Sequence, residues 1–178
     1  MNILIVVDMQ KDFVDGALGT PEAVSIVPAV TDRIRSYRSA GDTVIATRDT
    51  HDENYLSSQE GRNLPVVHCV RGTPGWQLDT AVAEALGDDC VIVDKPTFGS
   101  AELVRILGGY AEAYGEENVR VELAGLCTDI CVVSNALLIK AFYHEMPLSL
   151  DPGCCAGVTP EKHAAAIETM RSCQITIL

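Results

Sequence analysis

The sequence predicts a three-layer α/β domain, a doubly wound parallel sheet with helices on both faces. Short runs of branched apolar residues alternate along the chain with longer helical patterns, which is typical of successive β-α units. Several of these runs are continuously apolar, as expected of strands that are buried on both faces. The 178 residues suffice for one hydrophobic core and are short for two, so we expect a single domain over residues 1–178.

The first half of the chain alternates strand and helix around one long irregular segment. A strand is predicted over 3–7 and a second over 43–47. Between them, a Thr-Pro-Glu helix start at residues 20–22 predicts a helix that runs to about Ser39 and ends at Gly41. Residues 52–79 show no sustained periodicity and are rich in Gly, Pro, Asn and Ser. Because irregular segments of this length are usually functional, we expect an ordered excursion over the site.

The second half repeats the alternation, and a second Thr-Pro-Glu helix start stands at residues 159–161. The predicted elements are a helix over 80–86, a strand over 91–94, a helix over 101–107, a strand over 119–124, a helix over 128–144, a strand over 148–150, a turn over 151–153, a helix from 159 to about 171, and a closing strand over 174–178.

Composition excludes several classes of protein. The net charge of −12 argues against nucleic acid and anionic membranes as partners. No apolar run approaches the length of a membrane span. The seven cysteines are scattered without a paired CxxC pattern, and the N-terminus reads as a strand, not a signal peptide. We therefore expect a cytoplasmic protein in a reducing compartment.

The stretch from Val121 to Val133 predicts a strand, a tight turn at Gly125 and a helix whose first turn carries Cys131. A helix start offers free backbone N–H groups and a positive dipole end, which bias a thiol towards thiolate and can hold an oxyanion. The alternative is that Cys131 is a small buried hydrophobe, as most free cysteines are. The stretch alone leaves both interpretations open.

Candidate catalytic groups follow three of the predicted strands: Asp8, Lys95 and Cys131. Because the carboxyl ends of parallel strands meet at one edge of a sheet, ligands bind there. A cysteine nucleophile needs a base and a nearby cation or dipole, and an Asp–Lys–Cys set provides both. The alternatives are a loop-capping aspartate and a solvated surface lysine. The second is weakened because Lys95 directly follows an apolar strand.

A second candidate set is Asp49, His51, Glu60 and His68. Asp49 and His51 are two residues apart, so an extended segment can point both at one ion. Imidazole with carboxylate suits Zn²⁺, Mn²⁺ or Fe²⁺ better than Ca²⁺. Hydrogen-bonded structural histidines and a surface glutamate are the alternative.

These pieces together resemble the isochorismatase-like cysteine hydrolases, and within them the nicotinamidases. The matching motifs, which cover nearly the whole chain in order, are VDMQKDF at 7–13, TRDTH at 47–51, LPVVHCV at 64–70 with Gly72-Thr73, the Lys95 segment, GLCTDICV at 125–132, Asp151, and AGVT at 156–159.

The resemblance implies a six-stranded parallel sheet, an Asp8–Lys95–Cys131 triad and a cis peptide bond just before Cys127. It also implies an oxyanion hole made by the backbone amides of Cys127 and Cys131. The family usually has a small residue such as alanine where Cys127 stands. A disulfide between Cys127 and the nucleophile under oxidation is one hypothesis, and a simple exchange of one small residue for another is its alternative.

The resemblance further implies that Asp49, His51 and His68 bind a divalent metal, with Glu60 as the extra carboxylate of some bacterial members. Zinc is the expected ion, with manganese or iron as alternatives. Isochorismatases proper lack this set. In nicotinamidases the ion binds the pyridine nitrogen of the substrate.

The substrate pocket departs from the family pattern in two ways. Leu64 stands where many nicotinamidases have tryptophan, and the segment after Lys95 is too short for their longer lid. We therefore expect Phe13, Leu64 and Tyr55, or else Trp76, to line the pocket, with a neighbouring subunit as a further alternative because the family often forms dimers or tetramers.

The predicted function is hydrolysis of nicotinamide, or of a close small amide, to the acid and ammonia, as in NAD salvage. An alternative keeps the triad but acts on another amide, a carbamoyl compound or a ureido compound. A non-catalytic binding protein and a thiol redox protein using Cys127 and Cys131 are the remaining alternatives.

Overall fold

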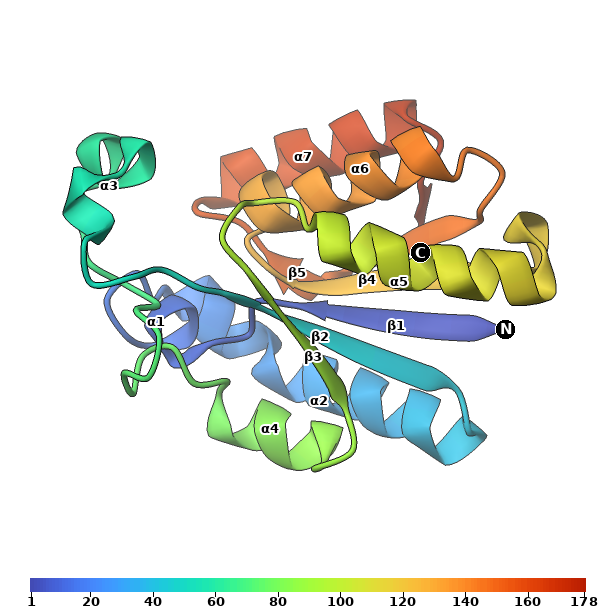
Figure 1. Cartoon of the computed structure of the whole chain (residues 1–178), viewed down its shortest axis with the longest axis horizontal. Helices are drawn as coiled ribbons and strands as arrows, with labels where there is room; N and C mark the ends of the chain where they lie inside the picture. Colours follow the sequence, from blue (N-terminus) through green and yellow to red (C-terminus); the bar gives the residue numbers. More distant parts are fainter.

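The computed structural model of the chain describes residues 1–178 and contains a six-stranded, all-parallel sheet (Figure 1). The strand order is β3-β2-β1-β4-β5-β6, so the predicted parallel sheet is confirmed. The strand order reverses between the neighbouring strands β1 and β4. Open α/β sheets bind ligands at such a point, outside the carboxyl ends of the strands. The strands are β1 (Asn2–Val7), β2 (Thr43–Asp49), β3 (Val91–Lys95), β4 (Arg120–Leu126), β5 (Leu148–Ala156) and β6 (Thr176–Ile177).

Helices cover both faces of the sheet, which confirms the three-layer architecture. In Figure 1, α2 and α4 lie on one side of the sheet and α5, α6 and α7 on the other. The α-helices are α1 (Lys11–Val14), α2 (Pro21–Ala40), α3 (Gln59–Asn63), α4 (Thr80–Leu86), α5 (Ala101–Tyr114), α6 (Val133–Phe142) and α7 (Pro160–Ser172). Short 3₁₀ turns span Tyr55–Ser57 and Glu116–Asn118, and a wide π-helical turn spans Thr128–Val132.

The central strand β1 contributes to two separate apolar cores. Ile3, Ile5 and Val7 pack with residues of α5, α6 and α7, whereas Leu4 and Val6 pack with residues of α2 and α4. Successive side chains of a strand point to opposite faces, so a continuously apolar run can bury both. The apolar run at the N-terminus is therefore what fixes β1 in the middle of the sheet.

Both Thr-Pro-Glu sequences begin helices as predicted. Thr20 Oγ1 accepts a hydrogen bond from Ala23 N at 3.0 Å, and Thr159 Oγ1 accepts one from Lys162 N at 3.3 Å. Each hydroxyl satisfies one of the N–H groups that a helix start leaves free. Gly41 ends α2 with φ of 75°, a conformation that glycine adopts without strain.

The predicted turn at 151–153 is wrong, because these residues lie inside a longer β5. The register of β4 and β5 shifts here: Leu123 pairs with Leu150, but Gly125 pairs with Cys155. The extra residues of β5 are accommodated as an irregularity within the strand, so the Pro-Gly sequence bends the strand without ending it.

Helix α5 is also longer than predicted, since it continues through Gly108 and Gly109 to Tyr114. A Cβ atom at Gly108 would lie 2.5 Å from the hydroxyl oxygen of Tyr143, and that hydroxyl donates to Val104 O at 3.0 Å. Gly108 therefore permits close packing against Tyr143 and does not mark a helix end. The short helix α1, Lys11–Val14, was not among the predicted elements.

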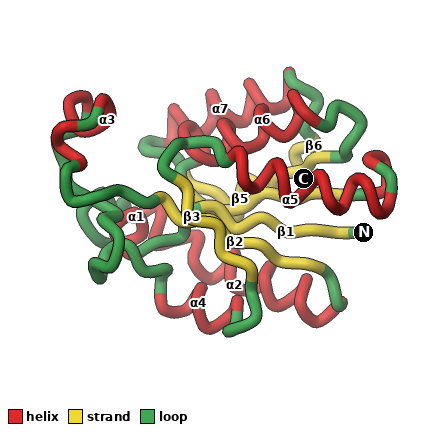
Figure 2. The backbone as a smooth tube through the Cα atoms, viewed as in Figure 1, coloured by secondary structure: helices red, strands yellow, loops and turns green.

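The predicted excursion between β2 and α4 is mostly irregular and projects from the body of the molecule where it carries α3 (Figures 1 and 2). Isolated bridges between Gln10 and Leu78 and between His51 and Val70 tie it back to the sheet end. No helix in the structure has the length and apolar character needed to cross a membrane.

Candidate active site and metal centre

Asp8 directly follows β1 at the carboxyl end of the sheet, where the strand order reverses between β1 and β4, and it is fully buried. Its φ of 48° lies in the left-handed region, which turns the chain sharply at the strand end. Thr47 donates a hydrogen bond from Oγ1 to Asp8 Oδ1 at 2.6 Å. The other carboxylate oxygen, Oδ2, lies 2.6 Å from Lys95 Nζ and has no further partner. One oxygen is thus held in place while the other faces the site.

Lys95 ends β3, and its side chain is 1% exposed. Besides Asp8, its ammonium lies 3.4 Å from Cys131 Sγ and 3.8 Å from Asp49 Oδ1. These contacts exclude the alternative of a solvated surface lysine. Because Lys95 reaches across the end of the sheet, it brings the ends of β1, β3 and β4 together at one point.

Cys131 lies in the π-helical turn that connects β4 to α6, and its side chain is buried. The Leu126–Cys127 peptide bond is cis, as the resemblance implied. Gly125, which precedes this bond, has φ of 118°, and a Cβ atom there would lie 2.1 Å from Val7 O. Only glycine lets β4 approach β1 so closely at this point. The predicted tight turn at Gly125 is wrong, because Gly125 lies within β4, which continues to Leu126. The predicted start of the helix is instead the π-helical turn that holds Cys131, and α6 begins after it.

Burial dominates the titration of the buried trio. It raises the pKa of the Cys131 thiol well above its ordinary value, and the neighbouring Asp8 carboxylate raises it further. Burial also raises the pKa of Asp8, against the opposing attraction of Lys95. For Lys95, burial disfavours the charge, but the combined attraction of Asp8, Cys131 and Asp49 raises the pKa. The raised pKa of the Cys131 thiol opposes the expected bias towards thiolate, so removal of its proton needs a base.

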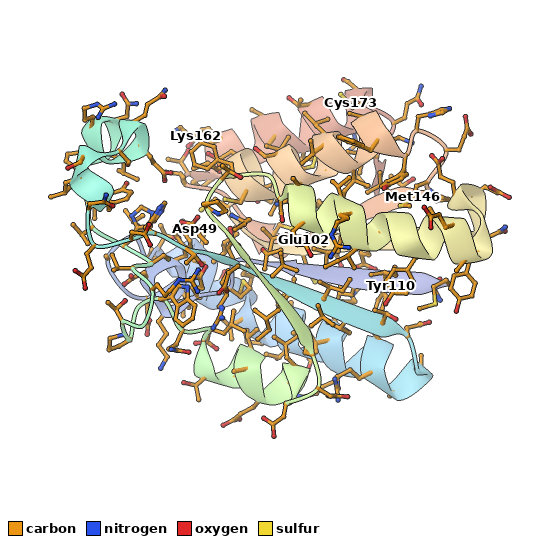
Figure 3. All side chains as sticks on the ribbon, in the orientation of Figure 1. Asp49, Glu102, Tyr110, Met146, Lys162 and Cys173 are labelled. Atoms are coloured by element: carbon orange, nitrogen blue, oxygen red, sulfur yellow. The ribbon has the colours of Figure 1, made fainter.

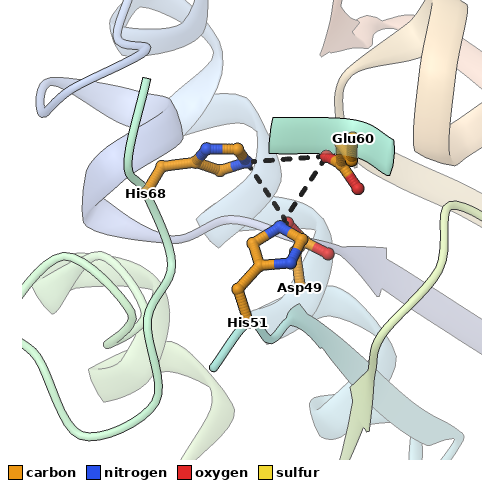
Figure 4. A group of neighbouring side chains, drawn as sticks. All are labelled: Asp49, His51, Glu60 and His68. Carbon is orange, nitrogen blue, oxygen red and sulfur yellow. Dashed lines mark ion pairs between the residues drawn. The ribbon is translucent and has the colours of Figure 1, made fainter. Parts of the chain in front are cut away.

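The second cluster joins Asp49, His51, Glu60 and His68 (Figure 4) and lies beside the first, since Asp49 Oδ1 is 3.8 Å from Lys95 Nζ. His51 Nε2 lies 2.9 Å from Asp49 Oδ2, and His68 Nε2 lies 3.6 Å from the same oxygen. Glu60 Oε1 lies 3.7 Å from His51 Nε2 and 3.9 Å from His68 Nε2. One donor atom from each of the four residues falls within 4.8 Å of the others. The end of β2, helix α3 and the part of the excursion that follows α3 thus meet at one point.

The chemistry of these donors fits a divalent transition metal. His68 Nδ1 lies 2.8 Å from Val66 O, so this nitrogen carries the proton and Nε2 faces the cluster with a free lone pair. His51 Nε2 is buried and makes no hydrogen bond of good geometry. Buried polar atoms without partners are rare and need an explanation. An ion held by two imidazoles and two carboxylates supplies it.

The pKa values of the two carboxyl groups in this cluster shift in opposite directions. Although burial alone would raise it, the neighbouring imidazoles of His51 and His68 and the ammonium of Lys95 lower the pKa of Asp49. For Glu60, burial and then the charge of Asp49 raise the pKa.

The side chain of Gln10 holds the backbone of Asp49, a residue of the metal cluster, in place. Gln10 was not among the site residues predicted from the sequence. Its side-chain Oε1 accepts from Asp49 N at 2.7 Å, and its Nε2 donates to Asp49 O at 2.9 Å and to Trp76 O at 2.9 Å. The carboxamide thereby fixes the backbone of Asp49 to the excursion. Only the position of Gln10 after β1 could have suggested this.

The four residues of the second cluster and Cys131 of the first border one cavity of about 760 Å³ at the carboxyl end of the sheet, whereas Asp8 and Lys95 do not line it. Figure 3 labels two residues of its wall, Asp49 at the end of β2 and Lys162 in the first turn of α7. The lining residues are Phe13, Leu18, Thr20, Ala23, Asp49, His51, Ser58, Gln59, Glu60, Asn63, Leu64, His68, Pro96, Thr97, Phe98, Leu126, Cys127, Ile130, Cys131, Gly157, Val158 and Lys162.

The structure places the expected substrate residues differently. Phe13 and Leu64 line the cavity, but Tyr55 does not. Tyr55 is buried behind the histidines, with its ring 4.6 Å from that of His51 and 5.0 Å from that of His68, and its hydroxyl donates to Leu64 O at 2.8 Å. The choice of Tyr55 as a lining residue is therefore wrong.

Trp76 does not line the cavity either. Its indole N–H donates to Thr50 Oγ1 at 2.9 Å, and its ring lies under the guanidinium of Arg48, 3.7 Å from the ring centroid. The second aromatic residue of the cavity is Phe98, on the short segment after Lys95, and it is 46% exposed. The position of this segment after Lys95 follows from the sequence, but the direction in which it crosses the end of the sheet does not.

Cys127 also lines the cavity, and burial, with the nearby Asp129, raises the pKa of its thiol to about 12. All seven cysteines are free thiols in the structure. The backbone N–H of Cys127 donates no hydrogen bond within the protein, so it is available to an oxygen in the cavity.

Comparison with known proteins gives consistent results. A family model described as the isochorismatase domain matches residues 2–178. The chain is 30% identical to a nicotinamidase of Schizosaccharomyces pombe, over 98% of this chain and 91% of the relative, and 27% identical to a nicotinamidase/pyrazinamidase of Mycobacterium tuberculosis, over 100% and 98%.

Solved structures agree with this. A pyrazinamidase of Pyrococcus horikoshii in complex with zinc is 36% identical, with a TM-score of 0.81 over 99% of this chain and 98% of the other. A pyrazinamidase/nicotinamidase of Streptococcus mutans is 25% identical, with a TM-score of 0.85 over the whole of both chains.

Proposed function

Since the chain belongs to the isochorismatase domain family, we propose that it is a cysteine amidohydrolase that converts nicotinamide to the acid and ammonia. The observation that carries this proposal is the meeting of Asp8, Lys95 and Cys131 beside a four-donor metal cluster on one cavity. The names of the similar nicotinamidases and pyrazinamidases support the substrate class.

The first chemical step is activation of Cys131. Burial and the neighbouring Asp8 carboxylate raise the pKa of this thiol, so its proton has to be removed, and Asp8 Oδ2, 2.6 Å from the Lys95 ammonium, faces the site. Asp8 takes the thiol proton as the sulfur attacks the amide carbonyl carbon. The Lys95 ammonium, 3.4 Å from the sulfur, stabilises the developing thiolate.

The attack places negative charge on the amide oxygen. The backbone N–H groups of Cys127 and Cys131, on the turn between β4 and α6, would donate hydrogen bonds to this oxygen. One such donor contributes about 3–4 kcal/mol to stabilisation of the transition state. As the tetrahedral intermediate collapses, the C–N bond breaks, and Asp8 returns its proton to the leaving ammonia.

The second half of the reaction releases the acid. Asp8, again a carboxylate, removes a proton from water, and the resulting hydroxide attacks the thioester carbon. The C–S bond breaks, the sulfur leaves as a thiolate beside Lys95, and Asp8 transfers to it the proton taken from water. Asp8 therefore takes up and gives back one proton in each half of the reaction.

Asp49, His51, Glu60 and His68 would hold the metal ion, whose chemistry is that of a Lewis acid that binds and orients a ring nitrogen. The cluster shares a cavity with Phe13 and Phe98, whose rings can bind a flat heteroaromatic substrate. Zinc fits the donor set, and manganese and iron accept the same ligands.

Ammonia release from nicotinamide by the purified protein tests this function. We expect turnover that falls after chelation and returns when Zn²⁺, Mn²⁺ or Fe²⁺ is added. Cys131→Ser is the inactive control and Cys173→Ser, at an exposed position, the matched active one. Absence of ammonia release by the metal-loaded protein would contradict the assignment of nicotinamide.

One observation favours a second candidate, hydrolysis of a larger amide or of a carbamoyl or ureido compound by the same trio. The cavity of about 760 Å³ is large for a single pyridine ring with one amide. Ammonia release from a panel of such compounds, with nicotinamide inert and Cys131 still reactive, would establish this candidate in place of the first.

A further inference from the structure

Asn135 lies one helical turn after Cys131 and is 1% exposed, and neither the sequence motifs nor the proposed chemistry assigns it a role. Its Nδ2 donates to Cys131 O at 2.8 Å and to Phe98 O at 3.2 Å. Its Oδ1 accepts from Ser100 N at 2.9 Å. Both N–H bonds of the carboxamide and one oxygen lone pair are thus used, which fixes its orientation.

These three bonds join two segments that the sheet holds far apart. Lys95 ends the edge strand β3, whereas Cys131 follows β4, and β2 and β1 lie between them in the sheet. The segment from Pro96 to Gly99 forms no helix or strand. It connects β3 to α5, and on the way it crosses the end of the sheet and contacts α6. The 3.4 Å contact between Lys95 and Cys131 depends on where that segment comes to rest.

Close packing reinforces the junction at Gly99. A Cβ atom there would lie 3.3 Å from both Ser134 O and Leu138 Cδ2, so the segment lies directly on α6. The next residue, Ser100, is buried, so its N–H needs a partner within the protein. Asn135 supplies that partner from α6, directly after the turn that carries Cys131.

We propose that Asn135 is a positioning residue, whose carboxamide fixes the segment after Lys95 to the start of α6 and so sets the spacing of Lys95, Phe98 and Cys131. This inference rests on the proposed function for its kinetic consequences, but its geometric consequence at Cys131 can be measured without any substrate. An alternative is that Asn135 only stabilises the fold by satisfying buried groups.

The two roles differ in what they change. Loss of a stabilising hydrogen bond lowers the melting temperature but leaves each folded molecule fully active. Loss of a positioning bond displaces Lys95 from the sulfur and Phe98 from the cavity wall. Small displacements of catalytic groups can reduce rates by as much as about 10²-fold. A positioning role therefore predicts changes in kcat and KM per folded molecule.

The principal variant is Asn135→Asp, which keeps the shape and the acceptor but removes both N–H donors. We expect kcat to fall at least tenfold and KM to rise, because the carboxylate repels Phe98 O and Cys131 O. We also expect a changed rate of Cys131 alkylation by iodoacetamide, measured by peptide mass mapping. Asn118→Asp makes the same chemical change at an exposed position and should leave all three quantities unchanged.

Asn135→Ser is the second variant, in case the buried carboxylate prevents folding. Its hydroxyl can reach Cys131 O, one turn back in the helix, but not Phe98 O. We expect a folded protein with raised KM and a smaller loss of kcat. Wild-type kcat, KM and alkylation rate per folded molecule in either variant, with only a lower melting temperature, would overturn the proposal.

The substrate question stays separate in this design. If the wild-type protein releases no ammonia from nicotinamide, the proposed substrate fails, and the alkylation rate of Cys131 alone then decides the role of Asn135. An unchanged alkylation rate in both variants would refute positioning of the thiol.

Discussion

Lys95 Nζ and Asp8 Oδ2 lie 2.6 Å apart, although their strands β3 and β1 are separated by β2. Both side chains are almost fully buried. A buried ion pair of this kind is costly to assemble and more costly to break, because removal of one partner leaves the other charge without compensation. In the proposed mechanism, the pair therefore links stability to catalysis at the same atoms.

Removal of either partner should destabilise the protein. We expect Asp8→Asn and Lys95→Gln each to lower the free energy of unfolding by about 3–5 kcal/mol. The double variant should lose less than the sum, because neither charge is left alone. Urea denaturation of the wild type and the three variants measures this coupling. Strictly additive losses would show that the two charges do not stabilise one another.

Loss of the nucleophile should separate activity from folding. We expect Cys131→Ala to reduce ammonia release by about 10³-fold or more and to leave the melting temperature within a few degrees of the wild-type value. Only a single small atom is removed from the cavity wall. Kinetics and thermal denaturation of the same preparation test this, and residual activity near the wild-type level would rule out Cys131 as the nucleophile.

Metal removal should lower stability as well as activity, because an ion that binds only the folded state stabilises it by mass action. At a metal concentration of about 100 Kd this contributes about 2.7 kcal/mol, which corresponds to about 5–10 °C in melting temperature for a chain of this size. Calorimetry before and after chelation, with zinc added back, measures the shift.

The same experiment ranks the ligands. We expect His51→Ala to abolish the metal-dependent shift and Glu60→Gln to reduce it, since the Glu60 side chain is 25% exposed and the His51 side chain only 9%. His144→Ala, at an exposed position outside the cluster, should keep the full shift. A full shift in His51→Ala would place the ion elsewhere.

His163 should make stability depend on pH below about pH 6.5. Burial lowers the pKa of this imidazole in the folded state, with Asp129 opposing the effect, and Thr128 Oγ1 lies 2.8 Å from its Nδ1. The unfolded chain binds a proton near pH 6.5, where the folded protein does not. Stability from this group is therefore complete above that pH and is lost as the pH falls.

Replacement by glutamine should remove this part of the pH dependence. We expect urea denaturation between pH 5 and pH 7.5 to give a flatter profile for His163→Gln than for the wild type. His144→Gln is the exposed control. Profiles of equal slope would show that His163 titrates alike in both states.

Phe98 should contribute to substrate binding more than to chemistry. Aromatic packing adds about 0.5–1.5 kcal/mol beyond burial, so we expect Phe98→Ala to raise KM about two- to tenfold with a smaller change in kcat. Phe142→Ala, at an exposed site near the end of α6, is the matched control. Steady-state kinetics distinguish the two, and an unchanged KM would remove Phe98 from the binding site.

Much of the fold could be predicted because its signals are local. Continuous apolar runs identify buried strands, and the Thr-Pro-Glu sequences identify helix starts through a side-chain cap and a proline at N1. The misjudged elements involve tertiary packing. Gly108 lies inside α5 because Tyr143 needs the space, and the Pro-Gly sequence of β5 is accommodated by a shift in register with β4.

In the candidate site, too, local sequence signals identified some residues, and tertiary packing alone placed the others. Asp8, Lys95 and Cys131 could be singled out because each follows a strand, and parallel strands end at one edge. Their roles, and those of the metal cluster, stay predictions for the experiments above. The cavity wall could not be derived, since loop paths decide that Phe98 enters it while Tyr55 is buried behind the histidines.

The sequence by itself determined the α/β class, the order of strands and helices, and the residue types available at the strand ends, because periodicity and caps are encoded in neighbouring residues. Only the tertiary structure decided which of those side chains meet, that burial raises the pKa of the Cys131 thiol, and that Asn135 bonds the segment after Lys95 to the start of α6. Burial and hydrogen bonding between distant segments set these properties, and both depend on how the whole chain packs.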